Sequence, residues 1–393
     1  MPANASFLLQ LGIIAGSALA FSVVVWRLHM PIALGQLIAG MVIGPFGLKL
    51  VTDLTSIQQM AEVGIVLLLF MVGLELDPFE LRAIGTKVLS FTSIEFATSF
   101  LIGAFAAILL GWGPVESLVL AGILSISSTA LVAKILYERR TLSASSAGLM
   151  MGALVVEDLI AVFMLSLLPN LEIARFPSLA IFTGWLARGG TLVVLVLVVG
   201  VYISPRVIDR ISQLDVDVDE AGFLLSLSLA FVLAILASLL GFSAATGAFL
   251  MGLVIRGKRA RFVYSKTRPV HDLFLTIFFV SMGMLIDFSQ LLNWATVLVI
   301  FPAAFVGKYI GSYAGAVLAS HRNQARDIAV DMNPRGEFSF VLAREASSVG
   351  VVRSAIYSIA GTTVMLTTLL AALITIARNA QKAYRKPARR VSH

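Results

Sequence analysis

The sequence predicts an all-α membrane protein of about thirteen transmembrane helices, arranged as two inverted six-helix repeats joined by a linking helix. Three observations predict this class: the composition, the recurrence of long apolar segments, and two pairs of similar segments at nearly one spacing. Hydrophobic residues make up 59% and charged residues 13% of the 393 residues. A soluble domain carries about 25% charged residues, so we expect a helix bundle solvated by lipid.

Apolar segments of about 20 residues, the length of a bilayer-spanning helix, recur from residue 7 to residue 378. The first lacks the basic start of a signal peptide, so it is interpreted as a membrane helix. Apolar length and helix breakers predict spans at 7–26, 31–48, 57–76, 86–110, 115–137, 145–169, 178–203, 221–240, 243–256, 270–287, 291–319, 325–348 and 354–378. The predicted units are a first repeat at 1–177, a linking helix at 178–205, a second repeat at 206–378 and a basic tail at 379–393.

Basic residues orient these spans in the membrane. The tail is rich in Lys and Arg, so the positive-inside rule places it in the cytoplasm and an odd number of spans places the N-terminus outside. The basic segment 256–268 is interpreted as a cytoplasmic loop. The net charge of +7 therefore reflects membrane topology, and we expect no nucleic-acid partner. The chain has no cysteine, which excludes disulfides and thiolate metal sites.

Two pairs of similar segments indicate an internal repeat. LLLFMVGLELDPFEL at 67–81 resembles IFFVSMGMLIDFSQL at 277–291, and LGQLIAGMVI at 34–43 resembles TGAFLMGLVI at 246–255. The matched pairs are Gly73 with Gly283, Asp77 with Asp287, Gly35 with Gly247 and Gly40 with Gly252. An odd number of predicted helices separates the matching ones, so the second half is inverted, which is a transporter architecture.

Charged residues inside the predicted spans are the candidate site. Glu157 and Asp158 sit side by side in GALVVEDLIAVFML, where a charge costs at least about 2.5–3.5 kcal/mol on insertion scales. Two adjacent carboxylates favour protonation of at least one of them, and in a water-filled cavity they can exchange a proton for a cation. Lys308 lies mid-span in FPAAFVGKYIGSYAG and is their expected partner. The other interpretations are a structural salt bridge for the acids and a snorkelling side chain for Lys308.

Two segments predict broken helices, which expose backbone dipoles to an ion. The first, SISSTALVAK at 125–134, gathers hydroxyl groups mid-span, although ordinary packing of small residues explains it equally well. The second, DMNPRGEFSF at 331–340, contains the breakers Pro334 and Gly336. The two segments are separated by about the repeat spacing. The polar residues at the breaks are Ser128, Thr129, Asn333, Arg335 and Glu337.

Five motifs in this order, FMVGLELDP, SSTALV, VEDLIAV, FFVSMGMLIDF and RGEF, resemble the monovalent cation:proton antiporters, in the branch of bacterial potassium-efflux systems and sodium/proton exchangers. The resemblance implies a dimer of thirteen-helix subunits in a bacterial or archaeal plasma membrane. It also implies a scaffold of helices 1–3 and 8–10, and a moving core of helices 4–6 and 11–13 whose two broken helices cross beside the acidic pair.

The resemblance further implies that Asp158 is the essential carrier of cation and proton. We therefore expect a secondary antiporter, not an enzyme, that exchanges K⁺, or else Na⁺, for H⁺ by alternating access. The expected ion and proton site is Asp158, Glu157, Thr129 and Ser128, and the expected charge partners and broken-helix residues are Lys308, Arg335, Glu337 and Asn333. We expect membrane lipid and a cytoplasmic regulatory domain or subunit as partners, and no cofactor or metal besides the transported cation. The alternatives are a gated cation channel and a sodium-coupled organic-anion symporter of similar fold.

Overall fold

The computed structural model of this protein describes residues 3–28, 30–51, 54–75, 85–138, 142–170, 179–211, 218–255, 257–286, 294–352 and 355–385. Within these residues the regular elements are helices. The first half contains α1 (Ala3–Arg27), α2 (Ile32–Ile43), α3 (Leu54–Glu75), α5 (Thr86–Leu109), α6 (Pro114–Ser125), α7 (Thr129–Glu138) and α8 (Ala144–Leu167), followed by the short 3₁₀ helix η1 (Leu168–Asn170). The remainder contains α9 (Leu179–Leu197), the π-helix η2 (Val198–Ile203), α10 (Ser204–Ile211), α11 (Val218–Leu239), α12 (Ala244–Val254), α13 (Gly257–Met284), α15 (Trp294–Leu318), η3 (Arg322–Gln324), α16 (Ala325–Asp331), α17 (Glu337–Ser348) and α18 (Ala355–Arg385).

Several of these helices are suited to a bilayer. Among the described residues, six helical segments are long and apolar enough to cross one: Leu8–Arg27, Gln58–Glu75, Thr86–Leu109, Ala144–Leu167, Glu220–Leu239 and Val297–Leu318. Further apolar helices are shorter, and α2, α6 and α12 are among them. Large apolar side chains such as Leu101 and Leu239 are exposed on the outside of the bundle, which is the arrangement expected against lipid. The protein is therefore a multi-pass membrane protein.

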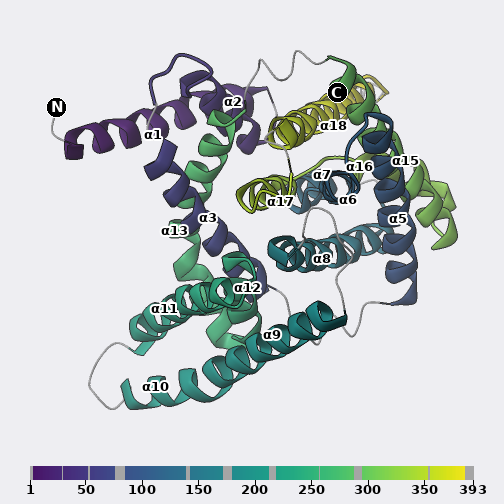
Figure 1. Ribbon diagram of the computed structural model, residues 1–393. Helices are drawn as coiled ribbons and strands as arrows, with labels where there is room; N and C mark the ends of the chain where they lie inside the picture. The colour runs from purple at the N-terminus through teal and green to yellow at the C-terminus, as the bar shows by residue number, and fades with distance from the viewer. Residues whose placement is uncertain are drawn as a thin grey trace, which may run out of the picture.

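The helices pack into two groups (Figure 1). The first group contains α1, α2, α3, α11, α12 and α13, and the second contains α5–α8 and α15–α18. The helix formed by α9, η2 and α10 runs along the bottom of the view and packs against α11 and α12 of the first group. We call the first the left group and the second the right group, after their places in Figure 1. The candidate site residues all come from the right group.

Glycines allow the helices of the left group to approach very closely. A Cβ atom on Gly40 of α2 would lie 1.9 Å from a carbonyl oxygen of α13, and one on Gly283 of α13 would lie 2.1 Å from a carbonyl oxygen of α2. Similarly, Cβ atoms on Gly73 of α3 and Gly252 of α12 would each lie 2.2 Å from a carbonyl oxygen of the facing helix. These four glycines form two of the three glycine pairs matched in the sequence, and the contact of α2 with α13 has the same form as that of α12 with α3. Small residues at such crossings are typical of membrane helices.

The structure differs from the sequence prediction in some helix boundaries. Residues 257–268, expected as a loop, form the start of α13, which continues through Pro269 to Met284. Lys, Arg and Ala are good helix formers, and the positive-inside rule predicts the side of the membrane, not the conformation. The final helix runs on to Arg385, into the expected tail. Asp77, Asp287 and the tail beyond residue 385 lie outside the described residues.

Candidate ion-binding site

The site is built where two broken helices cross. The three residues between α6 and α7 and the five between α16 and α17 leave the helical conformation and lie against each other. Ser127 and Arg335 form an antiparallel bridge, and the backbone N–H of Ser128 donates to the Pro334 carbonyl over 2.8 Å. Gly336 is required for this approach, because a Cβ atom there would lie 2.7 Å from the Cα atom of Ser128. Both breaks expected from the sequence are therefore present, and they cross.

Asp158 lies in α8 beside the start of α7. The Thr129 hydroxyl lies 3.2 and 3.1 Å from its two carboxylate oxygens and donates to this group. Thr129 is the first residue of α7, whose first turn is capped by the Ser128 hydroxyl accepting from the Leu131 N–H at 3.3 Å. Asp158 is 7% exposed, and the acids that act on it electrostatically include Glu337 and Glu157. The carboxylate of Asp158 thus has a hydroxyl partner and acidic neighbours.

Glu157 has a different environment, although it is the next residue. Its carboxylate accepts from the backbone N–H of Ser127 at 2.7 Å and from the ammonium group of Lys308 at 3.0 Å. Lys308 also donates to the Ser125 carbonyl at 2.5 Å, a carbonyl freed by the break, and forms an ion pair with Glu95 of α5. The side chains of Glu157, Lys308 and Glu95 have no exposed surface. The structure therefore brings Lys308 to Glu157 and Glu95, in a sealed cluster behind the crossing.

Arg335 and Asn333 join the breaks to α15. The guanidinium group of Arg335 donates to the carbonyls of Asn333 at 2.5 Å and Ala304 at 2.7 Å, and the side chain is 1% exposed. The Asn333 amide donates to the Phe305 carbonyl at 3.1 Å. Arg335 thus binds one carbonyl at the break and one in α15, while Asn333 binds a second carbonyl of α15, so the two side chains fasten the break to that helix.

Four charged side chains behind the crossing are almost completely buried; Asp331 of α16, 2% exposed, is a further buried acid of the right group and is not one of these four. Glu95, Glu157, Lys308 and Arg335 are all 1% exposed or less, and Arg335 interacts electrostatically with both of these acids. We call these four residues the buried charge set; it holds two negative and two positive groups. Asp158 is not among the carboxylates that Lys308 contacts. The four charges of the set therefore balance one another, and none of the positive ones is paired with Asp158.

The sequence analysis named eight of the residues described here but had no role for Glu95. The signal was present, because an isolated acid in the middle of an apolar helix is expected to have a buried partner. Sequence alone did not identify that partner, since α5 and α15 are about two hundred residues apart in the chain.

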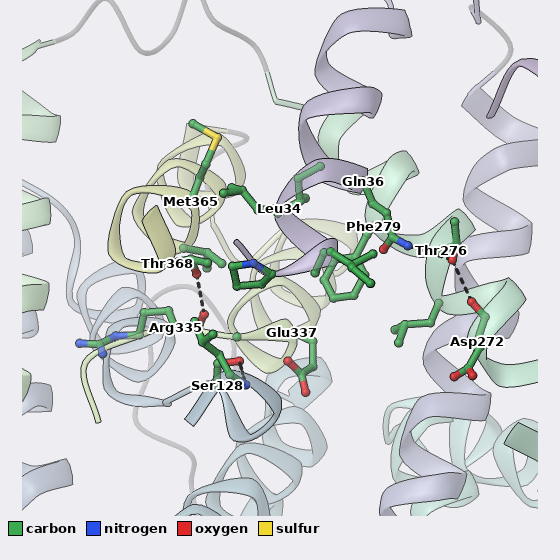
Figure 2. A pocket seen from close by; sticks show the side chains of 18 residues that line it. Leu34, Gln36, Ser128, Asp272, Thr276, Phe279, Arg335, Glu337, Met365 and Thr368 are labelled. Carbon is green, nitrogen blue, oxygen red and sulfur yellow. Dashed lines mark hydrogen bonds between the residues drawn. The ribbon is translucent and has the colours of Figure 1, made fainter. Parts of the chain in front are cut away.

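A cavity of about 490 Å³ leads to the crossing from one side. It lies between the left and right groups, with α2 and α13 on one wall and α7, α17 and α18 on the other. Its walls include Ser128, Glu337 and Asp272, while most of the remaining lining is apolar. Figure 2 shows that Arg335 extends away from the carboxylate of Glu337. The cavity wall at the crossing thus carries an acid, whereas the guanidinium group of Arg335 is bound to the carbonyls of Asn333 and Ala304; Asp158 itself is not a lining residue.

The other side of the crossing is closed. There, the C-terminal part of α17 and the N-terminal part of α18 pack against the left group through a continuous apolar cluster. The Tyr357 hydroxyl donates to the Met282 carbonyl at 3.1 Å. Arg344 donates to Glu62 at 3.0 Å and to the Gln58 carbonyl at 3.1 Å. We call these contacts the closed face; they join the two groups of helices on the side away from the cavity.

An all-helical membrane bundle with two discontinuous helices crossing beside buried acids defines a transporter of the broken-helix class. The profile of the family described as "sodium/hydrogen exchanger, transmembrane" matches residues 14–377. The chain therefore belongs to the sodium/hydrogen exchanger family of cation:proton antiporters.

Individual relatives agree with this assignment. The glutathione-regulated potassium-efflux system proteins KefC of Salmonella heidelberg and Klebsiella pneumoniae are each 31% identical over 351 residues, and KefC of Escherichia coli K12 is 31% identical over 352. These alignments cover 88% of this chain and 56% of each relative, so the chain spans little more than half of their length. The structure of the sodium proton antiporter MjNhaP1 from Methanocaldococcus jannaschii at pH 8 is similar in fold, with a TM-score of 0.71, 18% identity and 98% coverage of both chains.

Proposed function

We propose that this chain exchanges a monovalent cation for H⁺ by alternating access, and that Asp158 carries both ions in turn. K⁺ is favoured because the curated relatives at 31% identity are named potassium-efflux proteins, and Na⁺ is the second candidate. The observation that carries the proposal is the charge count: with the buried charge set neutral, Asp158 and Glu337 are the carboxylates at the crossing for which the described residues supply no cationic partner, and Asp158 is the more deeply buried of the two.

The chemistry follows from that count. An ionised carboxylate in a low-dielectric site is stable only with a counter-charge, which a proton or a cation from the cavity supplies equally well. The Thr129 hydroxyl offers an oxygen that can turn toward a bound cation, while Glu337 makes the neighbourhood more negative. Because one carboxylate serves both ions, binding of one expels the other, and this competition couples the two fluxes.

The side of the membrane on which the cavity opens is also part of the proposal. The cavity lies at the N-terminal end of α2, which follows Arg27, and next to the first turn of α7. The positive-inside assignment puts the N-terminal end of α2 and the C-terminal end of α7 on the cytoplasmic side, so we infer that the cavity opens toward the cytoplasm and that this is an inward-open conformation. Single cysteines introduced at Ser178 and Ser265 of this cysteine-free chain should react with impermeant reagents from opposite sides. Reaction from one side would overturn this topology.

We extend the proposal to the architecture. The matching glycine crossings of α2 with α13 and of α12 with α3 support two inverted repeats, with thirteen spans when each broken helix is counted once. We further propose a homodimer in membrane lipid. Because the curated relatives are longer, a cytoplasmic regulatory domain or subunit is proposed to control exchange. Native mass spectrometry from detergent tests the dimer directly, and a monomer at all detergent concentrations would refute it.

The decisive experiment uses proteoliposomes that contain a pH dye. Adding K⁺, Na⁺ or Li⁺ in turn to vesicles with an acidic interior should make the interior alkaline, most strongly with K⁺. Asp158→Asn should fold and insert but give no cation-driven proton movement. Wild-type-like exchange in that variant would refute Asp158 as the carrier. Rapid cation flux without coupled proton movement in the wild-type protein would instead indicate a channel.

A further inference from the structure

We propose that Glu95 is a positioning residue of the exchange site: it holds Lys308 beside Glu157 and thereby keeps the buried charge set neutral next to Asp158. This inference rests on the proposed function, because it concerns the electrostatic potential at the proposed carrier. It assigns a role to a buried acid that is not part of the cavity wall.

The packing of α5 against α15 fixes the position of Glu95. Gly311 of α15 lies directly against it, since a Cβ atom on Gly311 would be 2.7 Å from the carbonyl oxygen and 2.9 Å from the Cα atom of Glu95. Gly307 makes the corresponding contact with Ser99, one turn along α5, where its Cβ atom would lie 3.3 Å from the Ser99 Cα atom. Lys308 lies between these two glycines in sequence, so the helix contact that brings α15 close also brings the Lys308 ammonium group to the Glu95 carboxylate.

The position of the ammonium group matters for Asp158. Lys308 is held by three partners on three elements: Glu95 of α5, Glu157 of α8 and the Ser125 carbonyl at the end of α6. Among the described residues, two further charged groups interact with the cluster: Arg335, with both acids, and Asp158, with Glu157. With Glu95 neutralised, this set carries one net positive charge, close to the carrier and shielded from water.

An extra positive charge acts equally on both ions that compete for Asp158. The proton and the cation each carry one positive charge, so both dissociation constants should rise by the same factor. One unit charge placed about 10 Å from a carboxylate in a protein interior changes such a constant by about tenfold. At alkaline pH, where protons do not compete, the KM for the cation should therefore rise about tenfold. At acid pH the two effects cancel, so the KM should equal that of the wild-type protein.

The test measures the KM for K⁺, or for Na⁺ if that ion is transported, from acid to alkaline pH in proteoliposomes of Glu95→Gln. The KM should be raised at alkaline pH and unchanged at acid pH. The pH at which protons begin to compete with the cation should move by about one unit toward acid. Lys308→Gln removes a positive charge, so it should move the pH at which protons begin to compete toward alkaline values. The double variant Glu95→Gln/Lys308→Gln is again neutral and should return to the wild-type profile. Glu220→Gln, on an exposed position at the start of α11, is the matched control and should leave the profile unchanged.

Two results would overturn the inference while leaving the proposed function standing. One is an unchanged profile in a well-folded Glu95→Gln protein, and the other is a KM raised equally at every pH, as a general loss of packing would give. If Glu95→Gln does not fold, the test uses the double variant Glu95→Gln/Lys308→Gln. A pH dependence of KM in the double variant that differs from that of the wild-type protein would refute the inference. Absence of cation-driven proton movement in the wild-type protein would refute the proposed function itself.

Discussion

Replacing Gly336 with alanine tests whether close backbone contact at the crossing is required for exchange. The added Cβ atom would lie 2.7 Å from the Cα atom and 2.9 Å from the Cβ atom of Ser128, whereas ordinary contacts begin at 3.4 Å. The two breaks must therefore separate by about 0.7 Å. The neighbouring atoms belong to the backbone or lie next to it, so no side-chain rotation relieves the overlap.

The free-energy change can be estimated from this displacement. Overpacking of this kind destabilises a protein by about 1–3 kcal/mol. The 2.8 Å hydrogen bond from Ser128 to Pro334 would lengthen toward the 3.5 Å limit, and its loss contributes about another 0.5–1.5 kcal/mol. Gly336 has φ near −128°, a region that alanine also adopts, so the mutation regains about 0.4–1 kcal/mol through the unfolded chain. The net expectation is a loss of about 1–3 kcal/mol, with Thr129 displaced from Asp158.

The assay has two parts: thermal unfolding in detergent and exchange in proteoliposomes. Gly148→Ala is the matched control, because a Cβ atom there meets nothing within 4 Å and helix propensity favours alanine by about 1 kcal/mol. Gly336→Ala should unfold a few degrees below the control and exchange about tenfold more slowly or worse, since misplacement of a site by under 1 Å has effects of that order. Equal stability and equal exchange rates in the two variants would refute the reasoning.

Three further predictions concern the acidic pair, the glycine crossings and the closed face. Glu157→Gln should keep cation-dependent proton exchange and shift its pH profile toward acid; complete loss in a folded protein would show that both carboxylates are obligatory carriers. Gly73→Ala and Gly283→Ala should each lower stability in detergent by about 1–3 kcal/mol relative to Gly148→Ala, because both insert a Cβ atom within 2.2 Å of a carbonyl oxygen; a melting temperature equal to that of the control would contradict this. Arg344→Gln should change stability by less than about 1 kcal/mol, since its partner Glu62 is 70% exposed; a larger loss would mean that this ion pair is effectively buried.

Local chemistry made the two breaks predictable. Pro334 cannot continue a helix and hydroxyl groups satisfy freed backbone groups, so both interruptions follow from residues that lie within a few positions of each other. The pairing of Lys308 with one of the two acids followed from the cost of an unpaired charge in lipid. These inferences needed no knowledge of which helices touch.

The different environments of Glu157 and Asp158 could not be predicted from the sequence in the same way. Adjacent residues on a helix point about 100° apart, but periodicity does not show which neighbour each one meets. In a membrane bundle both lipid and core are apolar, so hydrophobic patterning distinguishes helix faces poorly. The partnership of Glu95 with Lys308 is likewise set by the glycine contacts between α5 and α15, which sequence reasoning did not anticipate.

The buried charge set also has a mechanical consequence. Its members and their hydrogen bonds join five parts of the right group to one another. These are α5, α8, α15, the C-terminal end of α6 and the break after α16. Sliding any one of these helices past another would separate buried opposite charges, at about 3–5 kcal/mol for each broken pair. The boundary with the left group is mainly apolar, apart from the few polar contacts of the closed face. Displacement is therefore easiest along that boundary, and the right group is expected to travel as one rigid body that carries its ion with it.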